Sequence, residues 1–186
     1  MIGLRSAREP ASEDAVREAE RQLEVSLPSE YRTFLMMVPM GRKPEDNIFR
    51  TTAEDDPGVG VRSFFGVGLP EDPGQDIDLV RRYDFYRDRI PSWTVPIGED
   101  DTGNLILISV RQDDEGSVWF WDHELEAEEG ESASEANLTF LADRFDEFLS
   151  RLEPFSVDDL PSGEGGPAWM DPAFAEEMRR QGLLEE

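Results

Sequence analysis

Carboxylate and imidazole side chains occur together in two short segments of the sequence. The residues concerned are Asp100, Asp101, Asp122, His123 and Glu124. Their oxygen and nitrogen atoms are ligands that a hard or borderline metal ion accepts. Their spacing matches no metal-binding motif, and polar clusters of this kind commonly cap backbone groups in turns. We therefore expect a hydrogen-bonded turn network here, with no metal and no other cofactor.

The sequence offers little for catalysis. It contains no cysteine and only one histidine, His123. It has neither a Gly-x-Ser-x-Gly motif nor a glycine loop that cradles phosphate. Paired carboxylates could act as a general acid and base, but such pairs arise by chance in a chain with 43 acidic residues. These features predict that the protein is not an enzyme.

Two adjacent strand patterns must position the acidic segments. Residues 105–110 are apolar on both faces and rich in β-branched side chains, which is typical of a central strand with helices packed on its sheet. Residues 117–121 are short and aromatic, and Gly116 closes the polar link between the two runs. The resulting hairpin is expected to bring segment 98–104 close to residues 122–124. Trp119 and Trp121 share one strand face, where sheet packing is the more common role, although an exposed tryptophan would also anchor a partner.

Helical patterns occur before and after the hairpin. Ser12 is an expected N-cap for a helix over 13–23, and Pro28 begins a second helix. The second helix carries an apolar stripe of Tyr31, Phe34, Leu35 and Val38. Start and stop signals predict a further helix over about 76–86. The apolar periodicity of 138–152, capped by Asn137, predicts the C-terminal helix.

The remaining segments are shorter or less regular. Residues 47–53 and 61–66 are expected to form an early hairpin, and 125–135 a solvated acidic loop. We expect one domain over 1–153, followed by a glycine- and proline-rich linker and a short helix near 171–182 that docks on the domain or on a partner. The whole pattern predicts an α+β fold with a mainly antiparallel sheet, flanked by two N-terminal helices and a C-terminal helix.

The charge is strongly acidic, with 43 acids against 18 bases and a net charge of −25. Such a charge disfavours nucleic acid and anionic membranes and steers basic partners towards the protein. A second explanation stays open, because seventeen of the bases are arginine, as a GC-rich genome or a salty cytoplasm would produce. The absence of a long apolar run at the start predicts a cytoplasmic location.

Three motifs carry a family resemblance over about 12–152. The first is Leu27-Pro28 followed by Tyr31 and Phe34-Leu35, and the second is Pro96-Ile97-Gly98 with Gly103-Asn104 before the central strand. The third is the aromatic strand that ends in Asp122-His123-Glu124. Together they resemble the SUKH superfamily, a large bacterial group of toxin-immunity proteins that also includes a fungal cell-wall-assembly regulator. One departure is Pro39-Met40-Gly41, where the family has an Asn-Gly-Gly turn.

The resemblance implies an immunity protein that binds a cognate bacterial toxin, possibly a basic nuclease, and blocks it by occlusion. Alternatives are a regulatory interaction module of the cell-wall-regulator type and a small-ligand-binding domain. The candidate partner-binding residues are Glu99, Asp100, Asp101, Trp121, Asp122, His123 and Glu124.

Overall fold

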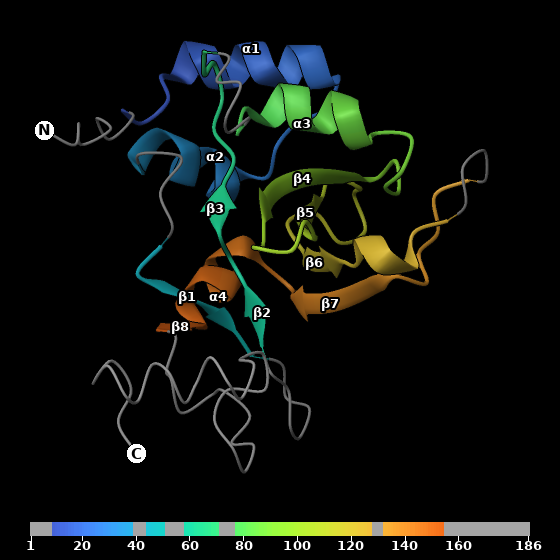
Figure 1. The fold of residues 1–186 in the computed structure, drawn as a ribbon. Coiled ribbons are helices and arrows are strands. Elements are labelled where there is room, and N and C mark those ends of the chain that lie inside the picture. The colour runs from blue at the N-terminus through green and yellow to red at the C-terminus, as the bar shows by residue number, and fades with distance from the viewer. Residues whose placement is uncertain (1–8, 39–43, 51–57, 71–76, 128–131, 155–186) are drawn as a thin grey trace, which may run out of the picture. The chain divides into compact units, whose positions relative to one another are not determined.

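A five-stranded antiparallel sheet forms the centre of the structure (Figure 1). The computed structural model describes residues 9–38, 44–50, 58–70, 77–127 and 132–154. The strands, in spatial order, are β3 (Ser63–Phe64), β4 (Thr94–Glu99), β5 (Leu105–Ser109), β6 (Val118–Trp121) and β7 (Leu138–Ala142). With the helices packed around it, this sheet confirms the predicted α+β class.

Strand β5 is the central strand, as its sequence predicts. All five of its residues are buried, and it pairs with β4 on one side and β6 on the other. The register places Leu105 opposite Trp121 and Leu107 opposite Trp119. Gly116 closes the β5–β6 turn at a φ of 90°, a value that glycine adopts without strain. The predicted hairpin is therefore confirmed.

Strand β4 does not follow from strand propensity, because it contains Pro96 and Gly98. A register shift between these two residues accommodates the proline as a bulge. Gly98 has a packing role as well, since a Cβ atom there would lie 2.8 Å from the Ser63 carbonyl oxygen of β3. Glu99 consequently belongs to the buried end of β4, whereas the sequence analysis placed it in the acidic segment 98–104 before the central strand.

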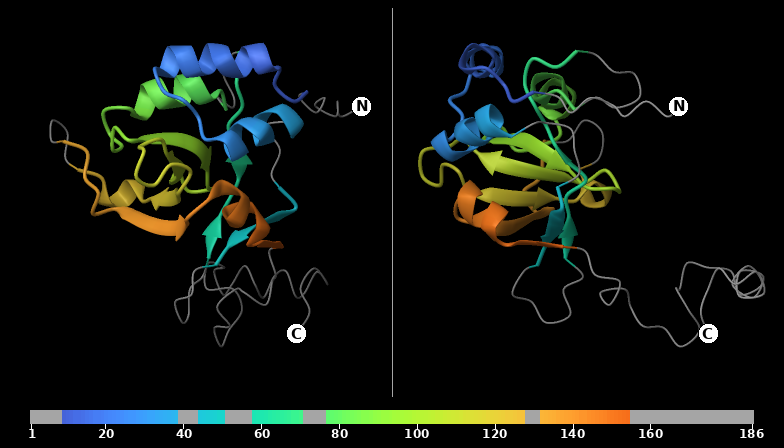
Figure 2. Two further views of the ribbon diagram at one scale, coloured as in Figure 1. Left: turned by 180° about the vertical axis from the view of Figure 1, so that it is seen from behind. Right: turned by 90° about the vertical axis from the view of Figure 1, so that its left-hand side faces the viewer.

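Three helices occur where the sequence predicts them: α1 (Glu13–Leu23), α2 (Ser29–Met37) and α3 (Leu79–Tyr86). The Ser12 side chain accepts a hydrogen bond from the Ala15 amide, as an N-cap does. Helices α1 and α3 lie side by side, and α3 packs on β4 (Figures 1 and 2). Tyr31 and Leu35 of α2 are buried as expected, but Val38 lies just beyond the helix and is 38% exposed.

The predicted C-terminal helix over 138–152 is wrong. Residues 138–142 form β7, and only α4 (Phe145–Ser150) is helical. Arg144 separates the two elements in an extended conformation, with φ −145° and ψ 152°. The apolar residues of strand and helix happen to recur at helical intervals, so the sequence pattern joined two elements into one. Asn137 caps no helix, since its amide donates to the Asp122 carbonyl.

A second, three-stranded antiparallel sheet has the order β2-β1-β8. Its strands are β1 (Asp46–Phe49), β2 (Val59–Gly60) and β8 (Leu152–Pro154). The predicted early hairpin is correct in part, because β1 pairs with β2, but residues 63–64 leave it to join the large sheet as β3.

Contacts divide the chain into Met1–Pro154 and Phe155–Glu186. The predicted linker and short helix near 171–182 lie outside the described residues, as does the departure at 39–41. Among the described helices, none has the length and apolar character needed to cross a membrane.

Candidate partner-binding surface

The β5–β6 hairpin brings the two acidic segments together, as predicted. His123 follows β6, and Asn104 precedes β5. The Asn104 side-chain oxygen accepts the His123 backbone N–H at 3.0 Å and lies 2.6 Å from the imidazole Nδ1. Since the amide of Asn104 donates elsewhere, this contact places the proton on Nδ1 of the imidazole. The contact fixes the ring orientation at the end of the sheet.

Asp100 organises the loop before β5. Its carboxylate accepts hydrogen bonds from the backbone amides of Thr102, Gly103 and Asn104 at 2.8–2.9 Å. It also accepts from the Thr102 hydroxyl and the Asn104 side-chain amide, both at 2.8 Å. This is the turn network that the sequence analysis favoured over a metal site. In the described part of the chain, no group of three or more potential metal ligands converges.

The remaining acids in these segments differ in how far they face solvent. Asp122 caps the short 3-10 helix η1 (His123–Leu125) by accepting the Glu124 amide at 2.9 Å. Asp101 is exposed and lies 3.9 Å from the Arg62 guanidinium, and Glu124 is exposed. We use the term acidic rim for Asp100, Asp101, Asp122 and Glu124, which lie in the two segments that adjoin the same end of β5 and β6.

Glu99 and Trp121, two of the predicted binding residues, are not part of that surface. Glu99 is 8% exposed and its carboxylate lies 2.5 Å from the Arg82 guanidinium of α3. The same guanidinium lies 5.1 Å from the ring centres of Phe65 and Tyr86. Glu99 therefore ties α3 to the sheet and offers no charge to a partner.

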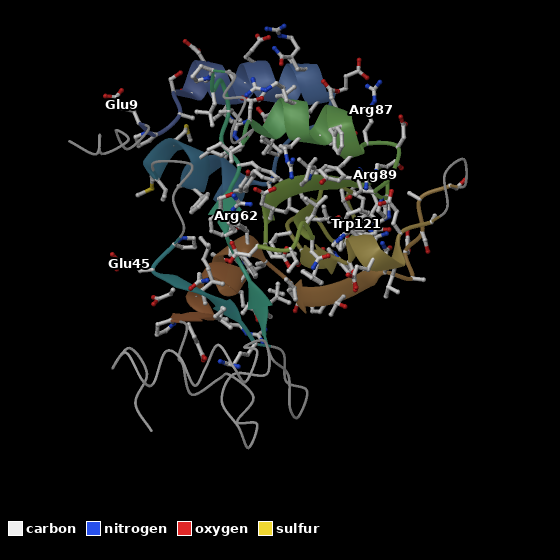
Figure 3. The ribbon with its side chains drawn as sticks, viewed as in Figure 1. Glu9, Glu45, Arg62, Arg87, Arg89 and Trp121 are labelled. Carbon is white, nitrogen blue, oxygen red and sulfur yellow. The ribbon has the colours of Figure 1, made fainter. Side chains whose placement is uncertain are left out.

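Trp121 has no exposed surface, because α3 covers it. Its ring centre is 5.8 Å from that of Tyr86, and the Arg89 guanidinium also lies 5.8 Å above it (Figure 3). Arg89 forms two hydrogen bonds of 2.6 Å with Glu126, which raise the pKa of the guanidinium. This pair links the segment after α3 to the residue that follows η1. The packing role that the sequence analysis favoured for Trp121 is correct.

Sequence reasoning missed an aromatic stripe formed by Trp93, Trp119 and Phe140. The ring of Trp119 lies edge-on to both neighbours, with centre-to-centre distances of 5.6 Å to Trp93 and 5.3 Å to Phe140. Phe140 is 46% exposed, and the two tryptophans are half-buried. Assigning 138–152 to a helix hid the stripe, because the alternation of β7 places Phe140 directly opposite Trp119.

The turn between β5 and β6 is held by Arg111 and Asp114, which form two hydrogen bonds of 2.7 Å. These bonds, with one from Ser109, lower the pKa of Asp114 below its usual value. The folded pKa is lower than the unfolded one, so the pair stabilises the fold above the unfolded pKa of 3.8. That contribution is lost as the pH falls through the folded pKa.

Asp114→Asn should therefore be less stable than the wild type at neutral pH. As the pH falls from about 5 to about 2, the free energy of unfolding should fall less in this variant than in the wild type. The half-exposed location limits the neutral-pH effect to about 1 kcal/mol or less. Urea denaturation across this pH range measures it, with the exposed Asp113→Asn as the control. Parallel pH curves for Asp114→Asn and the wild type would contradict the assignment.

A cavity of about 330 Å³ lies between α1 and α3. Glu18, Gln22, Asp78 and Arg81 are among its polar lining residues. Asp78 accepts the Leu69 amide at 3.0 Å, and Arg81 donates to the Leu69 carbonyl at 3.0 Å. These contacts hold the cavity wall together.

The family comparison agrees with the motifs in the chain. The SMI1 / KNR4 family (SUKH-1) matches residues 10–151. The SPbeta prophage-derived uncharacterized protein YokK of Bacillus subtilis (strain 168) is 28% identical over 167 residues, covering 81% of this chain and 80% of that protein. A crystal structure of a protein from Pseudomonas syringae pv. tomato aligns with a TM-score of 0.44 and 20% identity over 68% of this chain and 78% of that one. Because the family match spans most of the chain, the protein belongs to the SMI1 / KNR4 family (SUKH-1).

Proposed function

We propose that this protein is an immunity protein that binds a cognate bacterial toxin domain with a basic surface and neutralises it by occlusion, without catalysis. Membership of the SUKH family supports this role, since the family resemblance implies toxin-immunity proteins. The observation that carries the proposal is the acidic rim. Its backbone is fixed by Asp100 and His123, while Asp101 and Glu124 face solvent. A fixed array of exposed carboxylates suits recognition of a cationic protein surface.

The hydrogen bonds of the rim support occlusion, because they hold its shape. The carboxylate of Asp100 and the Nδ1 of His123 are engaged in hydrogen bonds that shape the turn. These two groups maintain the surface, and the exposed carboxylates of Asp101 and Glu124 add to its negative charge. A cytoplasmic location is part of this proposal, because the toxin would act there.

Co-expression with the product of the adjacent reading frame tests the proposed function. We expect that product to be toxic alone, to be tolerated with this protein, and to co-purify with it. A variant of the partner that has lost its toxic activity should still bind, because occlusion does not depend on turnover. An adjacent product that neither binds nor harms the cell would contradict the proposal.

Neutralising the acidic rim should slow association with that partner. In the triple variant Asp101→Asn, Asp122→Asn and Glu124→Gln, we expect association to slow by about tenfold and its salt dependence to flatten, because peripheral charges act mainly by steering. The Asn at 122 keeps an oxygen that can cap η1, so the fold should be retained. Stopped-flow kinetics at low and high salt measure the effect.

The matched control removes three acids from α1, through Glu13→Gln, Asp14→Asn and Glu18→Gln. It changes the net charge equally but leaves the rim intact, so its association rate should fall much less. Equal rates for the two variants would show that only the total charge matters. A salty or GC-rich background as the explanation of the acidity predicts instead that neither variant and no change of ionic strength alters the association rate.

The cavity between α1 and α3 favours a second candidate, a small-ligand-binding domain. Its volume of about 330 Å³ lies at the lower end of the range for ligand pockets. A polar metabolite that raises the melting temperature, with loss of the effect in Gln22→Leu, would support this candidate. A regulatory interaction module of the cell-wall-regulator type would instead bind a partner that is not toxic.

A further inference from the structure

Strand β7 is one end of the large sheet. It pairs with β6, and no other described strand pairs with its outer side. An outermost strand directs backbone N–H and C=O groups away from its sheet, where they can pair with another chain. Phe140, in the middle of β7, is 46% exposed, and its neighbour Thr139 is also exposed. Part of the strand is already engaged, because the Leu141 carbonyl accepts a hydrogen bond from Arg151 and the Leu138 amide donates to the Glu135 carbonyl. What β7 presents is therefore a short hydrogen-bonding edge and an apolar side chain.

The aromatic stripe continues from Phe140 across the sheet. The Trp93 indole N–H donates to Glu135 at 2.8 Å, and the Trp119 indole N–H donates to Ser117 at 2.8 Å. With these donors satisfied, the accessible parts of the stripe are ring surfaces. Half-buried aromatic rings that are already held in place lose little conformational freedom on binding and commonly dominate interface energies.

Negative charge surrounds the stripe. Arg111 stacks on Trp93 with its guanidinium 3.8 Å from the ring centre, and it is paired with Asp114. Glu135 and Asp113 lie close enough to this guanidinium to interact with it electrostatically. Asp143 follows β7 and is exposed. The nearby Arg144 is also paired, with Asp146 and Glu30. The unbalanced charge at this surface is therefore negative, and it complements a cationic partner.

Two other occupants fit this surface less well. In a pairing of two copies through β7, the acids that flank the strand in one copy, Glu135 and Asp143, would approach those of the other. Residues 155–186 of the same chain contain eight acids and two arginines, so their charge has the same sign as the surface. Like charges placed together at an interface are unfavourable. Both occupants are outcomes that the experiment below distinguishes.

We propose that the outer edge of β7, together with Phe140 and Trp119, binds an extended segment of the basic toxin by strand addition. The toxin segment pairs its backbone with β7, and its alternate side chains lie on the aromatic stripe. Lysine and arginine side chains beside the segment meet Asp113, Glu135 and Asp143. This inference rests on the proposed function and adds a second contact surface, distinct from the acidic rim.

Binding of the purified, inactivated toxin to full-length Phe140 variants tests the inference. Phe140→Ala should weaken the affinity about tenfold or more, as truncation of an interface aromatic does. Phe140→Arg should weaken it further by placing a positive charge against a basic partner. Phe140→Tyr keeps the ring and should bind within about twofold of the wild type. Met37→Ala, at a 70% exposed apolar residue of α2, is the control and should bind normally.

Hydrogen exchange supplies a readout specific to strand addition. We expect the amides of 138–142 that do not pair with β6 to exchange readily in the free chain and to become protected in the complex. Wild-type binding with unchanged affinity in Phe140→Ala and Phe140→Arg would overturn this inference while leaving the proposed function intact. Failure of the wild type to bind would overturn both. If the β7 amides that do not pair with β6 were already protected in the free chain, a second copy (in a dimer) or residues 155–186 (in a monomer) would occupy the edge, and the inference would be overturned.

Discussion

Leu107→Ala is expected to lower the free energy of unfolding by about 2–5 kcal/mol, the range for truncating a large aliphatic side chain in a core that cannot close around the lost volume. Leu107 has no exposed surface and lies in the middle of the central strand. Its backbone lies opposite Pro96 of β4 on one side and Trp119 of β6 on the other. The cavity left by the substitution therefore has rigid walls.

Chemical denaturation measures this effect. Thr139→Ala is a suitable control, because Thr139 is exposed on β7 of the same sheet and should change stability by no more than about 0.5 kcal/mol. A loss below about 1 kcal/mol for Leu107→Ala would be too small for a core truncation. That result would mean that β5 is not the centre of the sheet.

Arg82→Met should be about as damaging, because it is expected to lower the free energy of unfolding by about 3–5 kcal/mol. The substitution leaves the Glu99 carboxylate buried at the end of β4 without its cation. It also removes the guanidinium from between the rings of Phe65 and Tyr86. Breaking one side of a buried pair costs more than the pair itself contributes, because the remaining charge has lost its water as well as its partner.

A double-mutant cycle separates these contributions. Glu99→Leu combined with Arg82→Met should recover most of the stability lost in Arg82→Met alone, because the double variant buries no charge. Arg87→Met is the control for loss of an arginine on α3, since Arg87 is exposed. If the double variant were as unstable as the sum of the two single variants, Glu99 and Arg82 would not be energetically coupled.

Sequence patterns predicted those elements whose local signals agree with their packing. The N-cap Ser12 and the spacing of Val16, Ala19 and Leu23 specify α1, whose apolar side is the buried one. The apolar run that becomes β5 could only be buried on both faces. In each case the pattern that forms the element also determines where it packs.

Elements were missed where packing between distant segments overrides the local signal. The bulge at Pro96 and the close approach of Ser63 to Gly98 make a strand out of residues that disfavour one. In 138–152 the apolar spacing is compatible with one helix, and only pairing with β6 shows that its first third is a strand. Such pairings join residues far apart in the sequence, and a local pattern does not contain them.

For the candidate surface, the sequence predicted which segments meet but not which of their side chains are buried. The hairpin geometry correctly placed Asp100, Asn104 and His123 together, because both segments adjoin the same end of two paired strands. The burial of Glu99 was not predictable, since it depends on Arg82 reaching across from α3. The exposure of Phe140 was not predictable either, because it follows from the position of β7 at the end of the sheet.

Strand β8 makes completion of the fold depend on the end of the described chain. It pairs with β1, and Arg151 donates to the Arg50 carbonyl, 101 residues earlier. During synthesis β1 emerges early, but its partner is present only once residues 152–154 have left the ribosome. Closing so long a loop is slow relative to forming helices. Until then β1 can pair only with β2, and a ribosome that stalls before residue 152 releases a chain whose small sheet lacks its third strand.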